Sequence, residues 1–115
     1  MTGETKSLGK VIRDARVQTG CSLREIAKHL GISPSYQSDI ENDRRVPSQE
    51  VIWKIAKALG LDYDELMALG ERLGNDVKRY LRRHPAAVVL IRKLAEMNAT
   101  EKVLQELIDM IGVKE

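Results

Sequence analysis

The chain has 115 residues, of which 43% are hydrophobic and 31% charged, and its formal net charge is +2. This balance excludes a disordered segment, and no apolar run approaches the roughly 18 residues that a membrane-spanning helix needs. The single cysteine, Cys21, excludes an internal disulfide and indicates a reducing compartment, while the scarcity of aromatic residues (3%) favours helices over strands. We therefore expect an all-α cytoplasmic protein that does not associate with membranes.

Helical periodicity predicts five helices in the first part of the chain. Apolar residues recur at intervals of three and four, which places them on one face of each helix. The striped segments are Leu8 to Ala15, Leu23 to Leu30, Tyr36 with Ile40, Val51 to Leu59, and Leu66 to Leu69. Because these stripes are aliphatic, we interpret them as the core of one small helical domain.

Start and stop signals bound the expected helices. Ser22 with Glu25 is a capping-box pattern, and Ser33 stands before Pro34, which suits the first helical position. Further N-caps are predicted at Ser48, Asp62 and Thr100. Glycines that follow periodic stretches predict helix ends at Gly20, Gly31, Gly60, Gly70 and Gly112.

Two to three more helices are predicted near the C-terminus. Residues 75–83 have helical character, and His84-Pro85 ends that helix, because proline disfavours helical backbone in the residue before it. A helix from Pro85 to about Met97 and another over Thr100–Ile111 follow. We therefore divide the chain into a domain of residues 1–70 and a C-terminal helical extension of residues 71–115.

The spacing of the second and third helices is typical of a DNA-reading helix-turn-helix. Ala27 is small enough for close packing, and Gly31 makes the turn four residues later. The apolar residues that would lock the two helices together are Ile26, Leu30, Ile32 and Ile40. The third helix, residues 33–42, would then lie in the major groove, which is wide enough for one helix.

Residues 8–69 resemble the helix-turn-helix domain of the phage-repressor and Cro-like family, also called the xenobiotic-response-element (XRE) family of bacterial regulators. The matching features are Arg16, Gly20-x-Ser22, Ile26-Ala27, Gly31-Ile32-Ser33, Ser38, Ile40-Glu41, Pro47-Ser48 and Ile55-Ala56-x-x-Leu59. The resemblance implies a five-helix repressor-like domain. It also implies an internal ion pair between Arg16 and Glu41, for which a DNA contact is the alternative role.

Three positions depart from the family pattern. Leu23 stands where the family commonly has a glutamine that supports a phosphate contact. Gln37 replaces a buried aliphatic residue, so it must find local partners or leave the packing between the second and third helices looser. Asp43 replaces a loop glycine and tolerates left-handed backbone better than most residues.

The resemblance places base-reading positions on the third helix, at Pro34, Ser35 and Asp39. Beside them, Tyr36 can touch a thymine methyl group or a phosphate, or belong to the core, whereas Asp39 can instead be solvated or paired with a nearby basic residue. Arginines and helix N-termini are common phosphate donors, so the phosphate candidates are Ser22, Arg24, Ser38, Asn42, Arg44 and Arg45. A solvated loop is the alternative for Arg44 and Arg45.

The extension carries an apolar signal. The consecutive residues 88–91 point all round a helix, which requires burial from more than one side. We expect a dimer interface, with packing inside the chain or a partner or effector surface as alternatives. The candidate interface residues are Val88, Val89, Ile91, Leu104, Leu107, Ile108 and Ile111. A two-fold homodimer would read a palindromic operator.

The extension also carries a basic signal. Residues 72–93 hold seven Lys or Arg against one acidic residue, Asp76, which the net charge of the whole chain conceals. The densest run, residues 78–84, can be a solvated helix face, a set of additional phosphate contacts or a surface for an acidic partner.

The sequence contains no catalytic or metal-binding pattern. HExxH, paired CxxC, glycine-rich phosphate loops and GxSxG are absent, and His29 and His84 are far apart. We therefore predict a regulator without enzymatic activity, cofactor or metal, which binds double-stranded DNA as a dimer, represses transcription and stays with the nucleoid. The alternative is an antitoxin-like or adaptor protein that binds a protein partner through its C-terminal helices.

Overall fold

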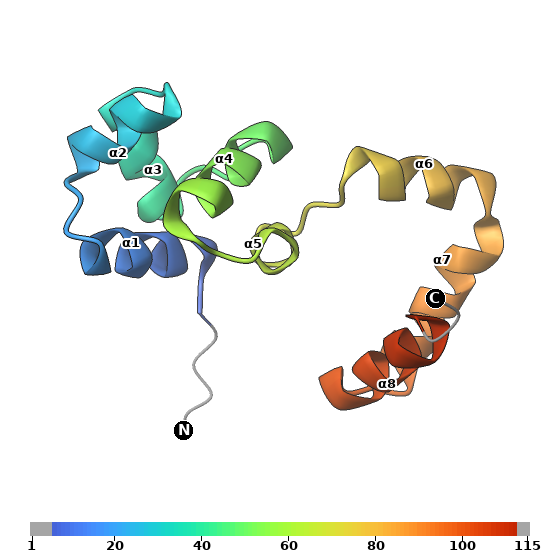
Figure 1. Cartoon of the computed structure of the whole chain (residues 1–115). Helices are drawn as coiled ribbons and strands as arrows, with labels where there is room; N and C mark the ends of the chain where they lie inside the picture. Colours follow the sequence, from blue (N-terminus) through green and yellow to red (C-terminus); the bar gives the residue numbers. More distant parts are fainter. Residues whose placement is uncertain (1–5, 113–115) are drawn as a thin grey trace. The chain divides into compact units, whose positions relative to one another are not determined.

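The computed structural model describes residues 6–112, and these form eight α-helices and no strand (Figure 1). The helices are α1 (Leu8–Gln18), α2 (Leu23–Leu30), α3 (Pro34–Glu41), α4 (Gln49–Leu59), α5 (Tyr63–Leu69), α6 (Asn75–Arg83), α7 (Pro85–Glu96) and α8 (Glu101–Gly112). The predicted all-α fold, with five helices and a helical extension, is confirmed. The chain divides between Gly74 and Asn75 into two compact units, α1–α5 and α6–α8. None of the described helices is long and apolar enough to cross a bilayer.

The helices begin where capping side chains satisfy the first backbone N–H groups. Ser22 Oγ accepts from the backbone of Glu25 (3.0 Å), and the Glu25 carboxylate accepts in return from the backbone of Ser22 (2.8 Å), so the predicted capping box is confirmed. Ser33 caps α3 ahead of Pro34. The predicted caps of α4, α5 and α8 each accept a backbone hydrogen bond as well, at Ser48, Asp62 and Thr100.

Glycine ends only some of these helices for conformational reasons. Gly31 and Gly60 follow α2 and α4 with φ of 76° and 67°, a left-handed backbone that side chains disfavour. Gly70 ends α5 with φ of −86°, so its backbone alone does not require glycine. Gly112 is the last residue of α8.

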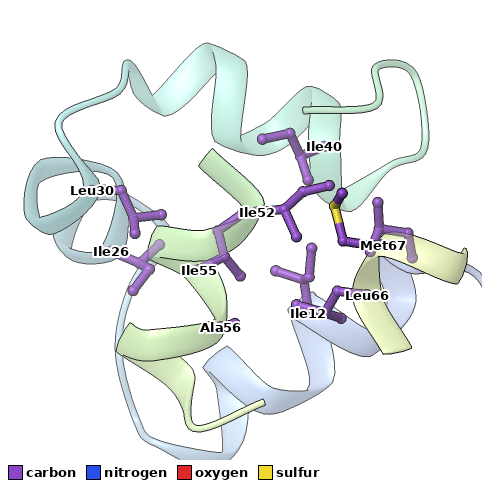
Figure 2. Close-up of a cluster of buried hydrophobic side chains, with 10 residues drawn as sticks. Ile12, Ile26, Leu30, Ile40, Ile52, Ile55, Ala56, Leu66 and Met67 are labelled. Atoms are coloured by element: carbon purple, nitrogen blue, oxygen red, sulfur yellow. The ribbon is translucent and has the colours of Figure 1, made fainter. Parts of the chain in front are cut away.

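The core of the first unit contains aliphatic side chains from all five helices (Figure 2). Ile12 of α1, Ile52 and Ile55 of α4, and Leu66 of α5 are each 0% exposed, and Ile40 of α3 is 1% exposed. Fully burying a side chain of this size contributes about 1.5–3 kcal/mol. These side chains belong to one buried cluster, which joins α2 and α3 to the other three helices of the unit.

The second unit buries none of its described residues. On α7, Leu90 is 59% exposed and Ile91 is 54% exposed, and on α8 Ile108 is 57% exposed. Leu104 is half-buried. The burial expected around residues 88–91 is therefore not supplied within the second unit by its described residues.

Candidate nucleic-acid interface

The helix-turn-helix is formed by α2, the turn Gly31-Ile32-Ser33 and α3. Ala27 is 0% exposed, so its small side chain lets the helices approach closely. The backbone of Ile32 donates to the Ala27 carbonyl (3.0 Å), which closes the turn. The first turn of α3 is thereby held at the surface, with Pro34 and Ser35 exposed.

Two base-reading candidates are already engaged with the loop between α3 and α4. Arg44 Nη1 lies 3.3 Å from Asp39 Oδ1, and the Arg45 guanidinium lies 4.5 Å from the centre of the Tyr36 ring. Tyr36 also packs in part against the core. Both contacts are at the surface, where an ion pair contributes about 0–1 kcal/mol, so the two arginines can exchange these partners for a ligand at small cost.

The remaining phosphate candidates lie at the end of α3 and the start of α2. The Asn42 amide donates to the backbone carbonyl of Ser38 (2.9 Å) and lies 3.3 Å from its hydroxyl. Ser22 is occupied by the capping box, and the hydrogen bond from its backbone N–H lowers the pKa of the Glu25 carboxyl. Arg24, in the first turn of α2, is exposed. Hydroxyl, amide and guanidinium groups of this kind are donors suited to phosphate oxygens.

Arg16 and Glu41 form an ion pair inside the first unit. Arg16 Nε donates to Glu41 Oε2 (2.7 Å) and Nη2 donates to Oε1 (3.0 Å), while Nη1 reaches the Cys21 carbonyl (2.8 Å). The hydrogen bond to Glu41 raises the pKa of Arg16, although burial opposes the shift. The side chains are only 12% and 4% exposed, so the pair joins α1 to α3 rather than facing a ligand.

Gln37 extends this pair. Its side chain is fully buried, and Nε2 donates to Glu41 Oε2 (2.8 Å), whereas Oε1 has no hydrogen-bond partner. One of the two expectations for Gln37 was that it finds local hydrogen-bond partners. This holds for its amide nitrogen but not for its amide oxygen. The contact was detectable in principle, because Gln37 and Glu41 are one helical turn apart.

Asp43 adopts the left-handed conformation expected of it, with φ of 59°. Its carboxylate also accepts a hydrogen bond from the Gly9 backbone (2.9 Å), a contact between distant segments that sequence reasoning missed. Arg72 was missed for the same reason. It was counted only as part of a basic segment, but its guanidinium donates to the Pro47 carbonyl (2.6 Å) and the Val46 carbonyl (3.0 Å).

The basic run on α6 is exposed throughout, except that Leu81 is half-buried. Within it, the Tyr80 and His84 rings stack with their centres 4.2 Å apart. In residues 6–112, no three His, Cys, Asp or Glu side chains gather in a way that could hold a metal ion. The contacts that the structure shows among the candidate residues join α3 to the α3–α4 loop, at Asp39 with Arg44 and at Tyr36 with Arg45.

Comparison with known proteins finds a family match that includes α2, α3 and the loop after α3. Residues 12–66 match the helix-turn-helix family. The ImmF control region 10 kDa protein of Bacillus phage phi105 is 43% identical over 61 residues, which cover 53% of this chain and 68% of that protein. The transcriptional regulator ClgR of Mycobacterium tuberculosis is 38% identical over 80 residues, which cover 69% and 70%. One chain of a SinR protein/SinI protein complex shares the fold, with a TM-score of 0.51 and 24% identity over 93% of this chain and 96% of that chain.

Proposed function

This chain belongs to the XRE-type helix-turn-helix family of DNA-binding transcriptional regulators, and we propose that it binds double-stranded DNA sequence-specifically as a homodimer. The observation that supports this most is the surface on which the first turn of α3 lies beside Arg44 and Arg45. In the proposed complex α3 occupies the major groove of a palindromic operator. The protein acts as a cytoplasmic, nucleoid-associated repressor, because a bound dimer blocks the DNA that it covers.

Base reading and backbone anchoring fall to different residues of this surface. Base edges are read by Pro34, Ser35, Tyr36 and Asp39, since a hydroxyl can donate or accept and a carboxylate accepts from cytosine N4. Phosphates are held by Ser22, Arg24, Ser38, Asn42, Arg44 and Arg45. Since the second group has more charge, we assign most of the affinity to it and the sequence preference to α3.

Selection of bound sites from random DNA by the full chain tests the proposal. The expected product is a palindrome whose half-sites are about one helical turn apart, bound at least about 1,000-fold more tightly than unrelated DNA at physiological salt. A selection that enriches no sequence would contradict sequence-specific binding. An enriched site without symmetry would contradict the two-fold arrangement.

The role of the loop is tested by replacing Arg44 and Arg45 together with Ala. Affinity should fall on all DNA sequences alike, and the slope of log K against log salt should become shallower by about one to two. The matched control replaces Lys28 and Lys57, which are exposed on α2 and α4, and removes the same charge. An unchanged slope in the loop variant would remove both arginines from the interface.

A second candidate function is favoured by the exposed apolar faces of α7 and α8. These faces can bind another protein, as in an antitoxin or adaptor, instead of a second copy of the chain. Sedimentation of the pure protein, combined with a dye that fluoresces on apolar surfaces, separates the two roles. A dimer without dye binding supports self-association, whereas a monomer that binds dye supports the partner role.

A further inference from the structure

Arg72 connects the segment after α5 to the loop between α3 and α4, residues 42–48. Its Nε donates to the Pro47 carbonyl (2.6 Å) and its Nη2 donates to the Val46 carbonyl (3.0 Å). Pro47 is buried just ahead of α4, so the guanidinium bonds to the loop where the loop is packed into the first unit. A planar guanidinium presents these N–H groups in a fixed fork, which a lysine ammonium cannot reproduce.

The backbone after α5 aims Arg72 at this loop. Glu71 takes the left-handed conformation (φ of 55°), and the Arg72 backbone donates to the Met67 carbonyl (2.8 Å), which closes a turn at the end of α5. Gly70 makes room for the turn, because a Cβ at this position would lie 3.2 Å from side-chain atoms of Leu8 and Val46. A strained, hydrogen-bonded turn therefore fixes the origin of the Arg72 side chain.

The other half of the loop is held by different contacts. Asp43 accepts from the Gly9 backbone (2.9 Å), and Arg44 lies against Asp39 (3.3 Å). Without Arg72 the loop would lose two hydrogen bonds near α4, and the contacts near α3 would open more often because they alone would hold it. Arg44 and Arg45 lie between the two anchored ends, so their positions depend on both.

We propose that Arg72 is a positioning residue for DNA binding, which fixes the α3–α4 loop so that Arg44 and Arg45 are arranged in advance for the DNA backbone. The inference rests on the proposed function. Two of the Arg72 nitrogens are engaged by carbonyl oxygens, so it acts through the loop rather than by touching a phosphate. Arranging a donor in advance avoids an ordering cost on binding, so loss of Arg72 should weaken binding without removing any donor of the loop.

The first test measures DNA binding of full-length Arg72→Lys, Arg72→Gln and wild type across a salt series, on the site that the wild type selects. Both variants should bind about three- to tenfold more weakly, with the salt slope of the wild type, because the phosphate donors of the loop are all kept. Lys57→Gln removes one positive charge elsewhere in the same unit and should match wild type. Wild-type affinity in Arg72→Lys would identify Arg72 as a direct charge contact and overturn the positioning role.

The second test needs no DNA. Amide hydrogen exchange of the full chain should accelerate in both Arg72 variants at Asp43 and Arg44, whose backbone N–H groups bond to Ile40 and Asp39 (3.1 and 2.8 Å), with α2 unchanged. Unchanged exchange in the loop would contradict the claim that Arg72 fixes the α3–α4 loop, even if DNA binding weakens. Wild type that binds no DNA sequence while the exchange changes would instead contradict the proposed function and remove the role of Arg72 in binding.

Discussion

Glu41 accepts hydrogen bonds from two side chains in the interior of the first unit, and the two donors are expected to differ in their effect on stability. Arg16 supplies two charged N–H groups to a carboxylate that is 4% exposed. Gln37 supplies one N–H group but also buries an acceptor without a partner. An unsatisfied buried acceptor such as Gln37 Oε1 costs about 1–3 kcal/mol, which is similar to what the hydrogen bond from Gln37 Nε2 to the charged carboxylate contributes.

Arg16→Met should therefore lower the free energy of unfolding by about 3–5 kcal/mol, because it leaves the Glu41 carboxylate buried without its charge partner. Gln37→Met has similar volume and removes both the hydrogen bond and the unsatisfied oxygen, so it should change stability by less than about 1.5 kcal/mol. Urea unfolding of the full chain measures both variants. Equal losses in the two would contradict this division.

Gly9 is the second residue whose substitution tests the packing of α1 on α3. A Cβ at Gly9 would lie 2.5 Å from the Ile40 carbonyl oxygen and 2.6 Å from that of Glu41. Gly9→Ala should destabilise by about 1–3 kcal/mol through this overlap, although alanine is normally the better helix residue. Gly112→Ala is the control, because a Cβ there meets nothing within 4 Å. Thermal unfolding in which both variants match wild type would argue against the close approach.

At the scale of the elements, the helices were predictable where their signals are local. Ser22 with Glu25 and Ser33 with Pro34 place two helix starts within four residues of sequence, and the structure has them there. The α3–α4 loop was not predictable, because Asp43 and Arg72 find their partners 34 and 25 residues away along the chain. A single sequence carries periodicity and capping, but it does not indicate which distant backbone groups a side chain will reach.

The capping box of α2 also makes a prediction about pH. The hydrogen bond from the backbone N–H of Ser22 to the Glu25 carboxylate lowers the pKa of Glu25 most, and the hydrogen bond with the Ser22 hydroxyl lowers it further. A carboxyl whose folded-state pKa is depressed adds stability above its unfolded-state pKa and loses it as pH falls through the folded value. Glu25→Gln keeps a capping geometry without the titration. The urea midpoint of wild type should therefore exceed that of the variant at neutral pH, and the difference should shrink as pH falls below the unfolded-state pKa of about 4.3, whereas parallel curves would contradict the effect.

For the whole molecule, the sequence indicated that residues 88–91 need burial from more than one side, but a single chain does not identify the covering surface. Ile91 and Ile108 remain more than half exposed, and Ile111 is 74% exposed. Three short helices that bury no described side chain lack the hydrophobic stabilisation that a unit of this size requires. A second copy would supply it through the same faces and would also place two copies of α3 on one operator.

We therefore expect the full chain to sediment as a dimer and the Ile91→Asp, Ile108→Asp double variant to sediment as a monomer, because two buried carboxylates without partners oppose association. Lys102→Gln, a change at an exposed polar position of α8, should remain dimeric.

The first unit by itself should not associate. It contains the described core and the hydrogen bond from Arg72 to the Pro47 carbonyl, so the chain ending at Gly74 should be a folded monomer. On the selected palindrome both monomers should lose about 100-fold or more in affinity, since each half-site is then bound without the gain from linkage, whereas binding to a single half-site should be unchanged in the double variant. A double variant that still sediments as a dimer would place the interface elsewhere.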